Sequence, residues 1–454
     1  MKIQQFSQLL FAEAKKNGFT DCQLNFTTGS GIMMSIPQGE QHHVKTGVVF
    51  TGSIGDCSAS AYSELLSEQA IYYLINAVKE NVEAIGGKPY HYYDGKAEYP
   101  QLPSVDKSIE DVEAVKQLHA EILDELALYP ELAKTTGVLH ANSITQRIIN
   151  TRGLDVTHTS NQIYCILYVV AEQNGSLTNS LIYRGGTALA DVKVKEMVKS
   201  AYDKAANYFG ARQVPTGKYS IVLPNDTASL MVQGFSVFFS AASVLNKISN
   251  LGGKLNQKIA GNCVTIVDDP HDPLGVFVWP FDARGVPSSK RVLVEQGVLK
   301  SYLHDIETAQ QFEQPSGEPG SFWQLDYNYA PKIYPSNFYV QPGDKSCDEL
   351  IAQMGDGLYV TDVTAYFHGA GINAISGDFS IPATGFVVEN GKITKPFDGI
   401  TIAGNLYDFM QNIEAVGNDL LFGLPTSFRP GAPMAYGCYG SPSMLVKNIT
   451  VSGS

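Results

Sequence analysis

The sequence predicts a multi-domain α+β protein, with an N-terminal α/β region followed by a large, antiparallel, β-rich C-terminal domain that contains a buried helix. Its 454 residues suffice for about three domains. Helical periodicity alternates with strand-like segments up to residue 217, and short strands with tight turns dominate after residue 263. The predicted domains are residues 1–95 (N-terminal α/β), 96–217 (central α+β) and 218–454 (C-terminal β-rich). The first two could pack as one unit.

The first 95 residues predict two helices and two short strands. Apolar residues at helical spacing follow the N-terminus, and Gly18 ends this first helix. The segments Cys22–Thr27 and Val44–Phe50 predict short strands. Ser67 predicts the N-cap of a second helix with one apolar stripe, which a glycine pair terminates. The segment Lys88–Pro103, rich in Tyr, Pro and Gly, predicts a linker.

The central segment predicts a helix, a pair of strands and a further helix. Ser108 and Asp111 resemble a capping pair at the start of the first helix, which a proline closes. Residues 137–172 are strand-like, and a turn at Asn150–Gly153 divides them into two arms. A further amphipathic helix is predicted over Leu189–Phe209, and a segment with proline and glycine then marks the second domain boundary.

The C-terminal segment predicts one buried helix and a series of β-hairpins. A helix is predicted from an N-cap at Asp226 to Val244, and it is apolar nearly all round, which indicates burial. Two hairpins are predicted at Arg291–Leu303 and Gly385–Phe397. The second contains Asn390-Gly391, the dipeptide that a type I′ turn favours because both central residues need a positive φ.

Composition and charge restrict the function classes. With 44% hydrophobic and 17% charged residues, the chain is not a disordered protein. Its 32 Lys+Arg and 45 Asp+Glu residues give a net charge of −13, which argues against sequence-independent binding to nucleic-acid phosphates. No segment resembles a signal peptide or reaches the length of a membrane span. The six dispersed cysteines predict no disulfide framework, so we expect a cytoplasmic protein without membrane or direct nucleic-acid partners.

Metal-binding patterns are weak in this sequence. Of the nine histidines only His42 and His43 are adjacent, and adjacent side chains diverge. There is no His-Glu-x-x-His spacing, which would place two imidazoles on one helical face. The richest ligand cluster is Asp268-Asp269-Pro270-His271-Asp272, whose prolines indicate a surface turn instead. His304-Asp305 could form an oriented imidazole pair, against the alternative of a solvated strand end.

Nucleophile and phosphate-binding motifs are also missing. The sequence has no Gly-x-Ser-x-Gly turn of an α/β-hydrolase. Cys438 lies in a glycine-rich stretch, AYGCYGSP, but carries no local signature of a thiol protease, so an inert buried thiol is the simpler interpretation. Gly252-Gly253-Lys254 is too short for a phosphate-binding loop. The residues by themselves therefore indicate no catalytic set.

Four blocks of the C-terminal half resemble the TldD/PmbA family. PFDARGVPSSKRVLVEQGVLKSYLHD is similar to the family signature FD-x-x-G-x-P…GVL-x-x-YLHD, and the other blocks resemble GdFS…GF-x-IenG, TIAGNL…I-x-x-v-G-nDl and sP…i-x-x-ltVaG. In chain order the four blocks are Pro280–Asp305, Gly377–Ile393, Thr401–Leu420 and Gly440–Gly453. Upstream, Gly52–Ala70 and the strand Tyr219–Leu223 fall in the expected order, so the resemblance covers nearly the whole chain.

The resemblance implies a cytosolic protein of a family long described as modulators of DNA gyrase and better understood as a metalloprotease system that acts on peptides and unfolded segments. In that system a TldD-type subunit supplies zinc through a His-Glu-x-x-x-His helix and a cysteine near the C-terminus. A TldE/PmbA-type partner lacks these ligands and completes the complex. Histidines five residues apart approach one helical face, and the glutamate between them can serve as a general base.

This sequence departs from the zinc-binding pattern. The helix expected to carry it lies within Asp226–Asn250, which contains neither His nor Glu. The ending around the family cysteine is replaced by TSFRPGAPMAYGCYGSP, which places Phe428 where that cysteine would fall and displaces Cys438. We therefore predict a TldE/PmbA-type subunit with no catalytic, cofactor-binding or metal residues of its own. Zinc is expected in a TldD-like partner.

Three functions follow as hypotheses. The first is a non-catalytic subunit that pairs with a TldD-like chain, or forms a homodimer, around a peptide substrate. The second is a self-sufficient hydrolase whose fold gathers His304, Asp305 and His368. The third is a regulatory binding protein that acts on DNA gyrase. Edge strands of the C-terminal domain could also hold an extended peptide by adding it as another strand.

Overall fold

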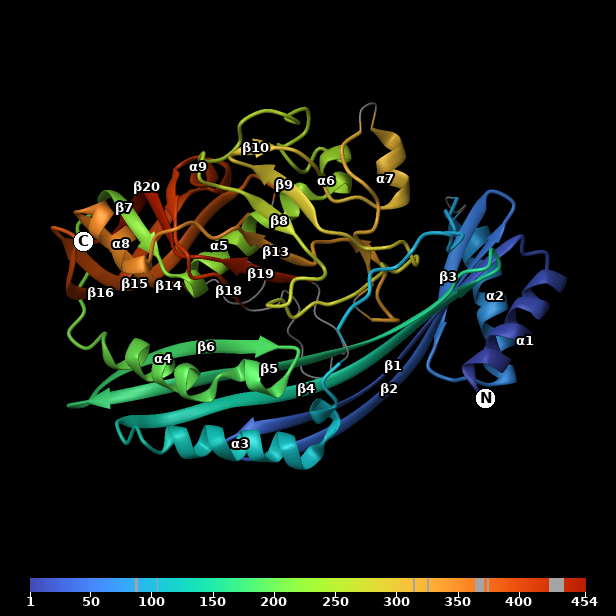
Figure 1. The fold of residues 1–454 in the computed structure, drawn as a ribbon, viewed down its shortest axis with the longest axis horizontal. Helices are drawn as coiled ribbons and strands as arrows, with labels where there is room; N and C mark the ends of the chain where they lie inside the picture. Colours follow the sequence, from blue (N-terminus) through green and yellow to red (C-terminus); the bar gives the residue numbers. More distant parts are fainter. Residues whose placement is uncertain are drawn as a thin grey trace.

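The fold is taken from a computed structural model of the chain, which describes residues 1–85, 89–103, 105–312, 315–324, 326–363, 371–373, 375–423 and 437–454. The α+β fold class is confirmed: a long six-stranded sheet runs beneath a β-rich C-terminal domain (Figure 1). The N-terminus lies with α1 at one end of the molecule and the C-terminus at the opposite end (Figure 1).

The N-terminal sheet is antiparallel throughout, with strand order β3-β2-β1-β4-β5-β6. The strands are β1 (Asp21–Ile36), β2 (Glu40–Ile54), β3 (Cys57–Ser63), β4 (Leu132–Asn150), β5 (Asp155–Gln173) and β6 (Ser176–Gly186). The central pairing of β1 with β4 joins residues from both sides of position 95. Residues 1–95 and 96–217 therefore contribute to one sheet, and the divisions at 95 and 217 stay predictions.

Helices cover one face of this sheet at two separate places. They are α1 (Ile3–Lys16), α2 (Glu68–Ile85), η1 (Lys107–Glu110), α3 (Val112–Leu126), η2 (Leu189–Val192) and α4 (Val194–Ala206). Even-numbered residues of β1 point to this face, because side chains alternate along a strand. Leu24 packs in the core beneath α1 and α2, whereas Ile32 and Met34 pack in the core beneath α3 and α4.

The opposite face of the sheet meets the C-terminal domain. Its residues are the other members of the alternation, such as Asn25 on β1 and His158 on β5. The Asn25 amide donates to the carbonyl oxygen of Ala283 at 2.7 Å, and His158 Nε2 lies 3.1 Å from the carbonyl oxygen of Val278. This face is polar along much of its length, in contrast to the apolar face beneath the helices.

The C-terminal domain contains a closed ring of strands. One sheet has the order β16-β15-β14-β7-β20-β17, and an additional pairing of β16 with β20 closes it. Its strands are β7 (Gly217–Leu223), β14 (Gly357–Val363), β15 (Asp378–Glu389), β16 (Lys392–Asn405), β17 (Ile413–Val416) and β20 (Met444–Ser452). Closure leaves only the four-residue β17 at an edge among the described strands, so this sheet offers little edge for an added peptide strand.

A second sheet of the C-terminal domain has the order β10-β9-β8-β13-β19-β18. Its strands are β8 (Ile266–Asp268), β9 (Arg291–Glu295), β10 (Val298–Leu299), β13 (Asn337–Val340), β18 (Leu421–Phe422) and β19 (Cys438–Ser441), and β11 (Phe322–Trp323) pairs separately with β12 (Lys332–Ile333). The remaining helices are α5 (Asn225–Ser236), η3 (Val237–Phe239), α6 (Ala241–Leu245), α7 (Ile306–Gln311), α8 (Cys347–Met354) and α9 (Leu406–Gln411). The core between the sheets is built around α5, whose Met231, Val232 and Phe235 are fully buried.

Several local predictions are confirmed. The Ser67 hydroxyl accepts a hydrogen bond from the Ala70 amide at 3.2 Å at the start of α2. Both predicted hairpins are antiparallel pairs. Asn390 and Gly391 have φ values of 51° and 71°, as a type I′ turn requires.

Other boundaries were wrong. The strands predicted at Cys22–Thr27 and Val44–Phe50 are parts of β1 and β2, which have 16 and 15 residues. The Gly-, Ser- and Thr-rich continuations have weak strand signals and are held extended by their partners. The helix predicted from Asp226 to Val244 is divided into α5, η3 and α6, and its N-cap is Pro224.

Candidate functional site

The buried helix α5 is the element on which the resemblance placed zinc chemistry. It connects β7 to η3, and its residues NDTASLMVQGFS include no His and no Glu. Its side chains are engaged in packing: Met231, Val232 and Phe235 fill the domain core. No group of three or more His, Cys, Asp or Glu side chains that could hold a metal ion occurs in the part of the chain that the structure describes.

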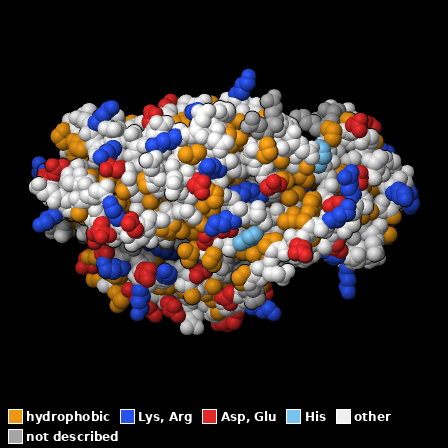
Figure 2. All heavy atoms as spheres, turned by 45° about the horizontal axis from the view of Figure 1, so that its top comes forward, with side chains coloured by type: hydrophobic (Ala, Val, Ile, Leu, Met, Phe, Trp, Pro, Cys, Tyr) orange, Lys and Arg blue, Asp and Glu red, His pale blue; other side chains and the backbone are white. Residues whose placement is uncertain are grey.

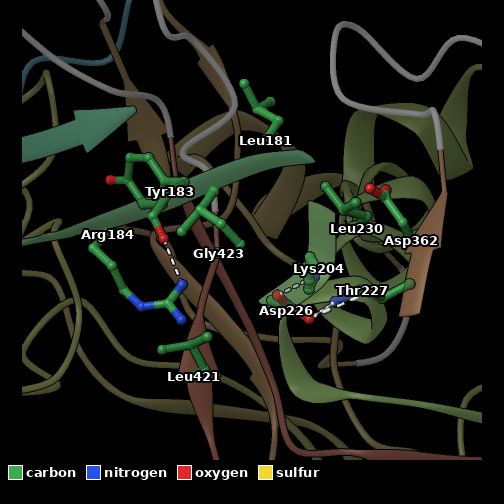
Figure 3. A pocket seen from close by; sticks show the side chains of 11 residues that line it. Leu181, Tyr183, Arg184, Lys204, Asp226, Thr227, Leu230, Asp362, Leu421 and Gly423 are labelled. Atoms are coloured by element: carbon green, nitrogen blue, oxygen red, sulfur yellow. Dashed lines mark hydrogen bonds and ion pairs between the residues drawn. The ribbon is translucent and has the colours of Figure 1, made fainter. Parts of the chain in front are cut away.

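The first turn of α5 meets helix α4, which packs on the N-terminal sheet, through a paired polar contact. Lys204 on α4 forms an ion pair with Asp226 at 2.6 Å (Figure 3). The Thr227 hydroxyl donates to the carbonyl oxygen of Thr361 on β14 at 2.8 Å. The Tyr208 hydroxyl lies 2.5 Å from the Thr361 hydroxyl. The contact therefore joins α4, α5 and β14 with each of these groups partnered.

Two carboxyl groups at this contact have opposite pKa shifts. Burial disfavours the charge of Asp226, but the neighbouring Lys204 and Arg184 hold its pKa below the usual value. For Asp362 burial dominates: it raises the pKa to about 7, with Lys204 opposing the shift and Asp226 adding to it. The pair resembles an acid–base couple in its electrostatics, although structural ion-pair networks shift pKa values in the same way.

The space beside these residues is limited. A cavity of about 40 Å³ lies between Tyr183, Arg184 and the first turn of α5 (Figure 3). Such a volume has room for water but not for a peptide. An adjoining groove of about 410 Å³ shares Leu181 and Asp362 with the cavity. It runs between β6, the last strand of the N-terminal sheet, and the strands of the closed ring, so it can accept side chains of a larger ligand.

A hydrogen-bonded group of side chains lies on the sheet face under the C-terminal domain. His43 Nε2 is 3.0 Å from the Asn142 side-chain oxygen, and the Asn142 amide nitrogen is 3.3 Å from His140 Nδ1. The Tyr164 hydroxyl also contacts His140 Nδ1. Asn142 and His140 are fully buried, whereas His43 is half-buried. Burial lowers the pKa of His140 to about 3, so its ring is neutral at neutral pH.

The segment that carries the first block of the resemblance docks the two domains. The guanidinium of Arg284 lies 4.4 Å from the ring centroids of Tyr90 and Phe322, and it also forms a close ion pair with Glu307. Asp282 Oδ1 accepts from the backbone amide of Arg284 at 2.9 Å. These contacts give the motif a structural role, because cation–π and ionic contacts hold the linker against the C-terminal domain.

The structure places the residues of the ligand-rich segment Asp268-Asp269-Pro270-His271-Asp272 in different surroundings. Asp268 is fully buried at the end of β8, where its Oδ1 accepts from Ser336, whereas Asp272 is partly exposed. The prediction of a surface turn is therefore wrong for Asp268, Asp269 and Pro270, which are all buried. His42 and His43 point to different surroundings: His42 contacts Glu40 at 2.6 Å on the surface, and His43 contacts Asn142.

His304 is not a solvated strand end, because its side chain is fully buried. Its Nδ1 lies 3.1 Å from the Thr308 hydroxyl and its Nε2 lies 3.0 Å from the Ser316 hydroxyl. The Asp305 carboxylate instead caps α7 by accepting from the Thr308 amide at 2.8 Å. Burial lowers the pKa of His304 to about 4, which does not suit a general base at neutral pH. His368 lies outside the described residues.

Cys438 on β19 is fully buried, and burial raises the pKa of its thiol to about 12, as an inert thiol requires. Gly252-Gly253-Lys254 forms a turn, in which the Lys254 amide donates to the Leu251 carbonyl at 3.1 Å. Phe428 lies outside the described residues.

The sequence patterns do not predict the polar groups at either contact. Lys204 is one of several lysines on an amphipathic helix, and the position of Asp226 predicts only a helix cap. A partial signal existed on β4 alone, where His140 and Asn142 alternate with the apolar Leu139 and Ala141. On β5 the residues from His158 to Gln162 are all polar, so the sequence there does not distinguish one sheet face from the other.

The surface gives two further observations. Basic and acidic side chains are interspersed over the face drawn in Figure 2, and the described residues form no continuous basic surface there. In the described part of the chain, we find no helix with the length and apolar character needed to span a membrane.

Comparisons with known proteins point to one family. The chain matches the PmbA/TldA metallopeptidase central domain over residues 98–208 and the PmbA/TldA metallopeptidase C-terminal domain over residues 216–453. It is 31% identical over 254 residues to the metalloprotease PmbA of Escherichia coli O157:H7, covering 56% of this chain and 53% of that protein. The chain thus spans about half the length of that relative in the alignment.

Two solved structures are similar over nearly the whole chain. One is a Thermotoga maritima protein named as a candidate modulator of a DNA gyrase, with 26% identity, a TM-score of 0.87, and coverage of 99% of this chain and 100% of the other. The second is TldE from Thermococcus kodakarensis, with 17% identity, a TM-score of 0.84, and the same coverage. The second likeness concerns the fold alone.

Proposed function

Because this chain belongs to the PmbA/TldD metallopeptidase family, we propose that it is the subunit of a TldD/TldE-type cytoplasmic peptidase that does not bind zinc. In this proposal it pairs with a TldD-like chain that carries His-Glu-x-x-x-His, and the assembly cleaves peptides or unfolded segments. The chain contributes walls of the substrate space and no metal ligand.

The observation that supports this proposal is the composition of α5. This helix contains no histidine and no glutamate, and its single carboxylate, that of Asp226, forms an ion pair with Lys204. A zinc site of the proposed type needs two imidazoles on one helical face with a base between them. Met231 and Phe235 direct one face of the helix into the domain core.

The groove beside β6 supports a role in holding substrate. It has a volume of about 410 Å³ and is lined by Tyr168, Leu177 and Pro382 together with the carboxyl groups of Asp362 and Asp398. Thr178, Asn179 and Thr384 also line it, so the groove offers hydrogen-bonding groups as well as apolar contacts to a ligand. Its position between the sheet and the closed ring suits a chain that threads between the two domains.

The test is metal content and peptidase activity of the purified chain, alone and mixed with a TldD-like chain. We expect less than stoichiometric zinc and no peptidase activity for the chain alone, and activity in the mixture. The matched control is a TldD-like chain whose first motif histidine is replaced by alanine, which should abolish activity of the mixture. Stoichiometric zinc together with peptidase activity in the chain alone would contradict the proposal.

A further inference from the structure

The groove beside β6 combines apolar side chains with two carboxyl groups. Its volume is about 410 Å³, and its apolar and aromatic wall consists of Tyr168, Leu177, Leu181, Tyr208 and Pro382. The charged groups are those of Asp362 and Asp398. Among the described residues that line the groove, none is a lysine, an arginine or a histidine. We call it the acidic groove, because a positively charged ligand would meet two carboxyl groups in it and no basic side chain of its lining.

The two carboxyl groups lie on strands of the closed ring, on either side of Thr384. Asp362 on β14 is the strand partner of Thr384 on β15. The Thr384 hydroxyl donates to Asp398 Oδ1 on β16 at 2.8 Å. Adjacent strands are about 4.8 Å apart, so the backbones that carry the two carboxyl groups are about 10 Å apart. The hydrogen bond draws the Asp398 carboxyl group toward β15, and a cationic group above Thr384 would therefore face both carboxyl groups.

Asp398 has one oxygen that is oriented by the protein and one that is available to a ligand. Its Oδ1 accepts from the Thr384 hydroxyl and also from the Gly399 amide at 2.7 Å. Its Oδ2 makes no hydrogen bond or ion pair with another residue in the described part of the chain, and the residue is exposed. A cation can reach Oδ2 without breaking a contact that holds the strands together.

The basic group that acts on Asp362 is already paired with another carboxylate. Lys204 opposes the pKa shift of Asp362, but its ammonium group lies 2.6 Å from Asp226. Burial is the largest cause of the shift, and together with Asp226 and Asp398 it outweighs Lys204 and raises the pKa of Asp362 to about 7. A positive charge placed beside Asp362 would offset this local excess of negative charge.

From these observations we infer that the acidic groove binds the side chain of a lysine in the peptide substrate. The ammonium group donates to Asp362, to Asp398 Oδ2 and to the Thr384 hydroxyl oxygen, which matches its three N–H donors. The four-carbon stem packs on the apolar wall of the groove, as lysine stems do on apolar surfaces. An arginine fits less well, because its planar fork favours a carboxylate with both oxygens available, whereas Asp398 has one oxygen engaged. The inference rests on the proposed function and adds a preference for one class of residue in the substrate.

The experiment compares two capped peptides, acetyl-Ala-Lys-Ala-amide and acetyl-Ala-norleucine-Ala-amide, for binding to the full chain by calorimetry. Norleucine has the four-carbon stem of lysine without the ammonium group. The lysine peptide should bind about tenfold more tightly. Raising the salt concentration from about 0.1 M to about 1 M should weaken binding of the lysine peptide and leave the norleucine peptide unaffected, because salt screens charge pairs.

The variants Asp362→Asn and Asp398→Asn each remove one negative charge with little change in volume. Each should weaken binding of the lysine peptide by about three- to tenfold and leave binding of the norleucine peptide unchanged. Asp398 is exposed, so its variant should keep the thermal midpoint of the wild-type chain. The matched control is Asp203→Asn, which removes a carboxylate that pairs with Lys199 on the exposed side of α4 and should change neither affinity.

Equal affinity of the wild-type chain for the two peptides would overturn the inference, as would no binding of the lysine peptide in the millimolar range. Equal losses for both peptides in the two variants would also contradict it. Tighter binding of spermidine than of the lysine peptide would overturn it in favour of a free polyamine.

Two combined results separate this inference from the proposed function. A preference for lysine in a chain whose mixture with a TldD-like chain has no peptidase activity would leave the acidic groove standing and remove the proposed function. An active mixture together with equal affinities for the two peptides would remove the inference and leave the proposed function.

Discussion

The N-terminal region meets the C-terminal domain through helix α4 and through the sheet, and these two contacts differ in how their polar groups are satisfied. At the first turn of α5, Lys204, Asp226, Thr227 and Tyr208 all have partners. On the sheet face farther along, His140, Ser160, Gln162 and Tyr183 each keep a buried atom without one. The difference indicates that the first contact is a fully paired polar link to the C-terminal domain, whereas the second leaves buried polar atoms unpaired among the described residues.

The largest effect on the free energy of unfolding is expected for a core residue of α5, the helix whose first turn makes the paired contact. Phe235 is fully buried and packs against Phe338 at a centroid distance of 6.4 Å. Phe235→Ala should lower the free energy of unfolding by about 3–5 kcal/mol, because the cavity adds to the lost burial. Urea unfolding measures it, with Tyr72→Ala on the exposed surface of α2 as the control. A loss below 1 kcal/mol, the scale of surface changes, would mean that α5 does not anchor the core.

The ion pair of the paired contact comes next. Lys204→Met leaves the Asp226 carboxylate without its ammonium partner, and we expect a loss of about 2 kcal/mol in the free energy of unfolding. The matched control is Lys199→Met on the same helix, because the Lys199–Asp203 pair is 65% and 44% exposed. Exposed pairs contribute about 0–1 kcal/mol. Equal effects of the two substitutions would show that the contact at α5 is no stronger than a surface pair.

Asp362 gives the paired contact a pH dependence. Its pKa is raised to about 7 from the usual value near 4, so the folded state binds the proton more tightly than the unfolded state. This contribution to stability is fully present below about pH 4 and is lost as pH rises through 7. Asp362→Asn should therefore be more stable relative to the wild-type chain at pH 8 than at pH 5, by about 1–3 kcal/mol. Urea unfolding at both pH values tests this, and an equal difference at both would contradict the shift.

The smallest expected effect on stability compares the same substitution, Tyr to Phe, at the two contacts. It should lower the free energy of unfolding at one contact and leave it unchanged or raise it at the other. Tyr208→Phe removes a hydroxyl that lies 2.5 Å from Thr361, and it should cost about 1 kcal/mol. Tyr183→Phe removes a hydroxyl without a partner and should cost nothing or stabilise the chain. Thermal unfolding of both variants measures the pair, and a similar loss in both would remove the distinction between the two contacts.

Much of the fold could be predicted from local signals. Ser67 as a helix cap, the turn at Asn150–Gly153 and the Asn390-Gly391 hairpin follow from side-chain chemistry that acts within a few residues. The full length of β1 could not be predicted, because its Gly- and Ser-rich second half is held extended by β2 and β4 and not by its own propensity. Nor could the break between α5 and α6, which depends on how Phe238 and Phe239 pack in the core.

The candidate site depended on long-range contacts. Lys204 and Asp226 are 22 residues apart, and His43 and Asn142 are 99 residues apart. No sequence spacing encodes such a pairing; only the sheet register brings the second pair together. The resemblance identified the family and the helix without zinc ligands, and it carried no information on the polar face of the sheet.

The division of the N-terminal sheet between two chain segments has a practical consequence for engineering. Strands β3, β2 and β1 come from residues before position 95, and β4, β5 and β6 come from residues after it. Each segment made alone would expose a long unpaired strand, β1 in one and β4 in the other. The two segments are therefore complementary fragments. Expressed together as separate chains, they should reassemble through the β1–β4 pairing, which makes the break near position 95 a natural place for a split reporter.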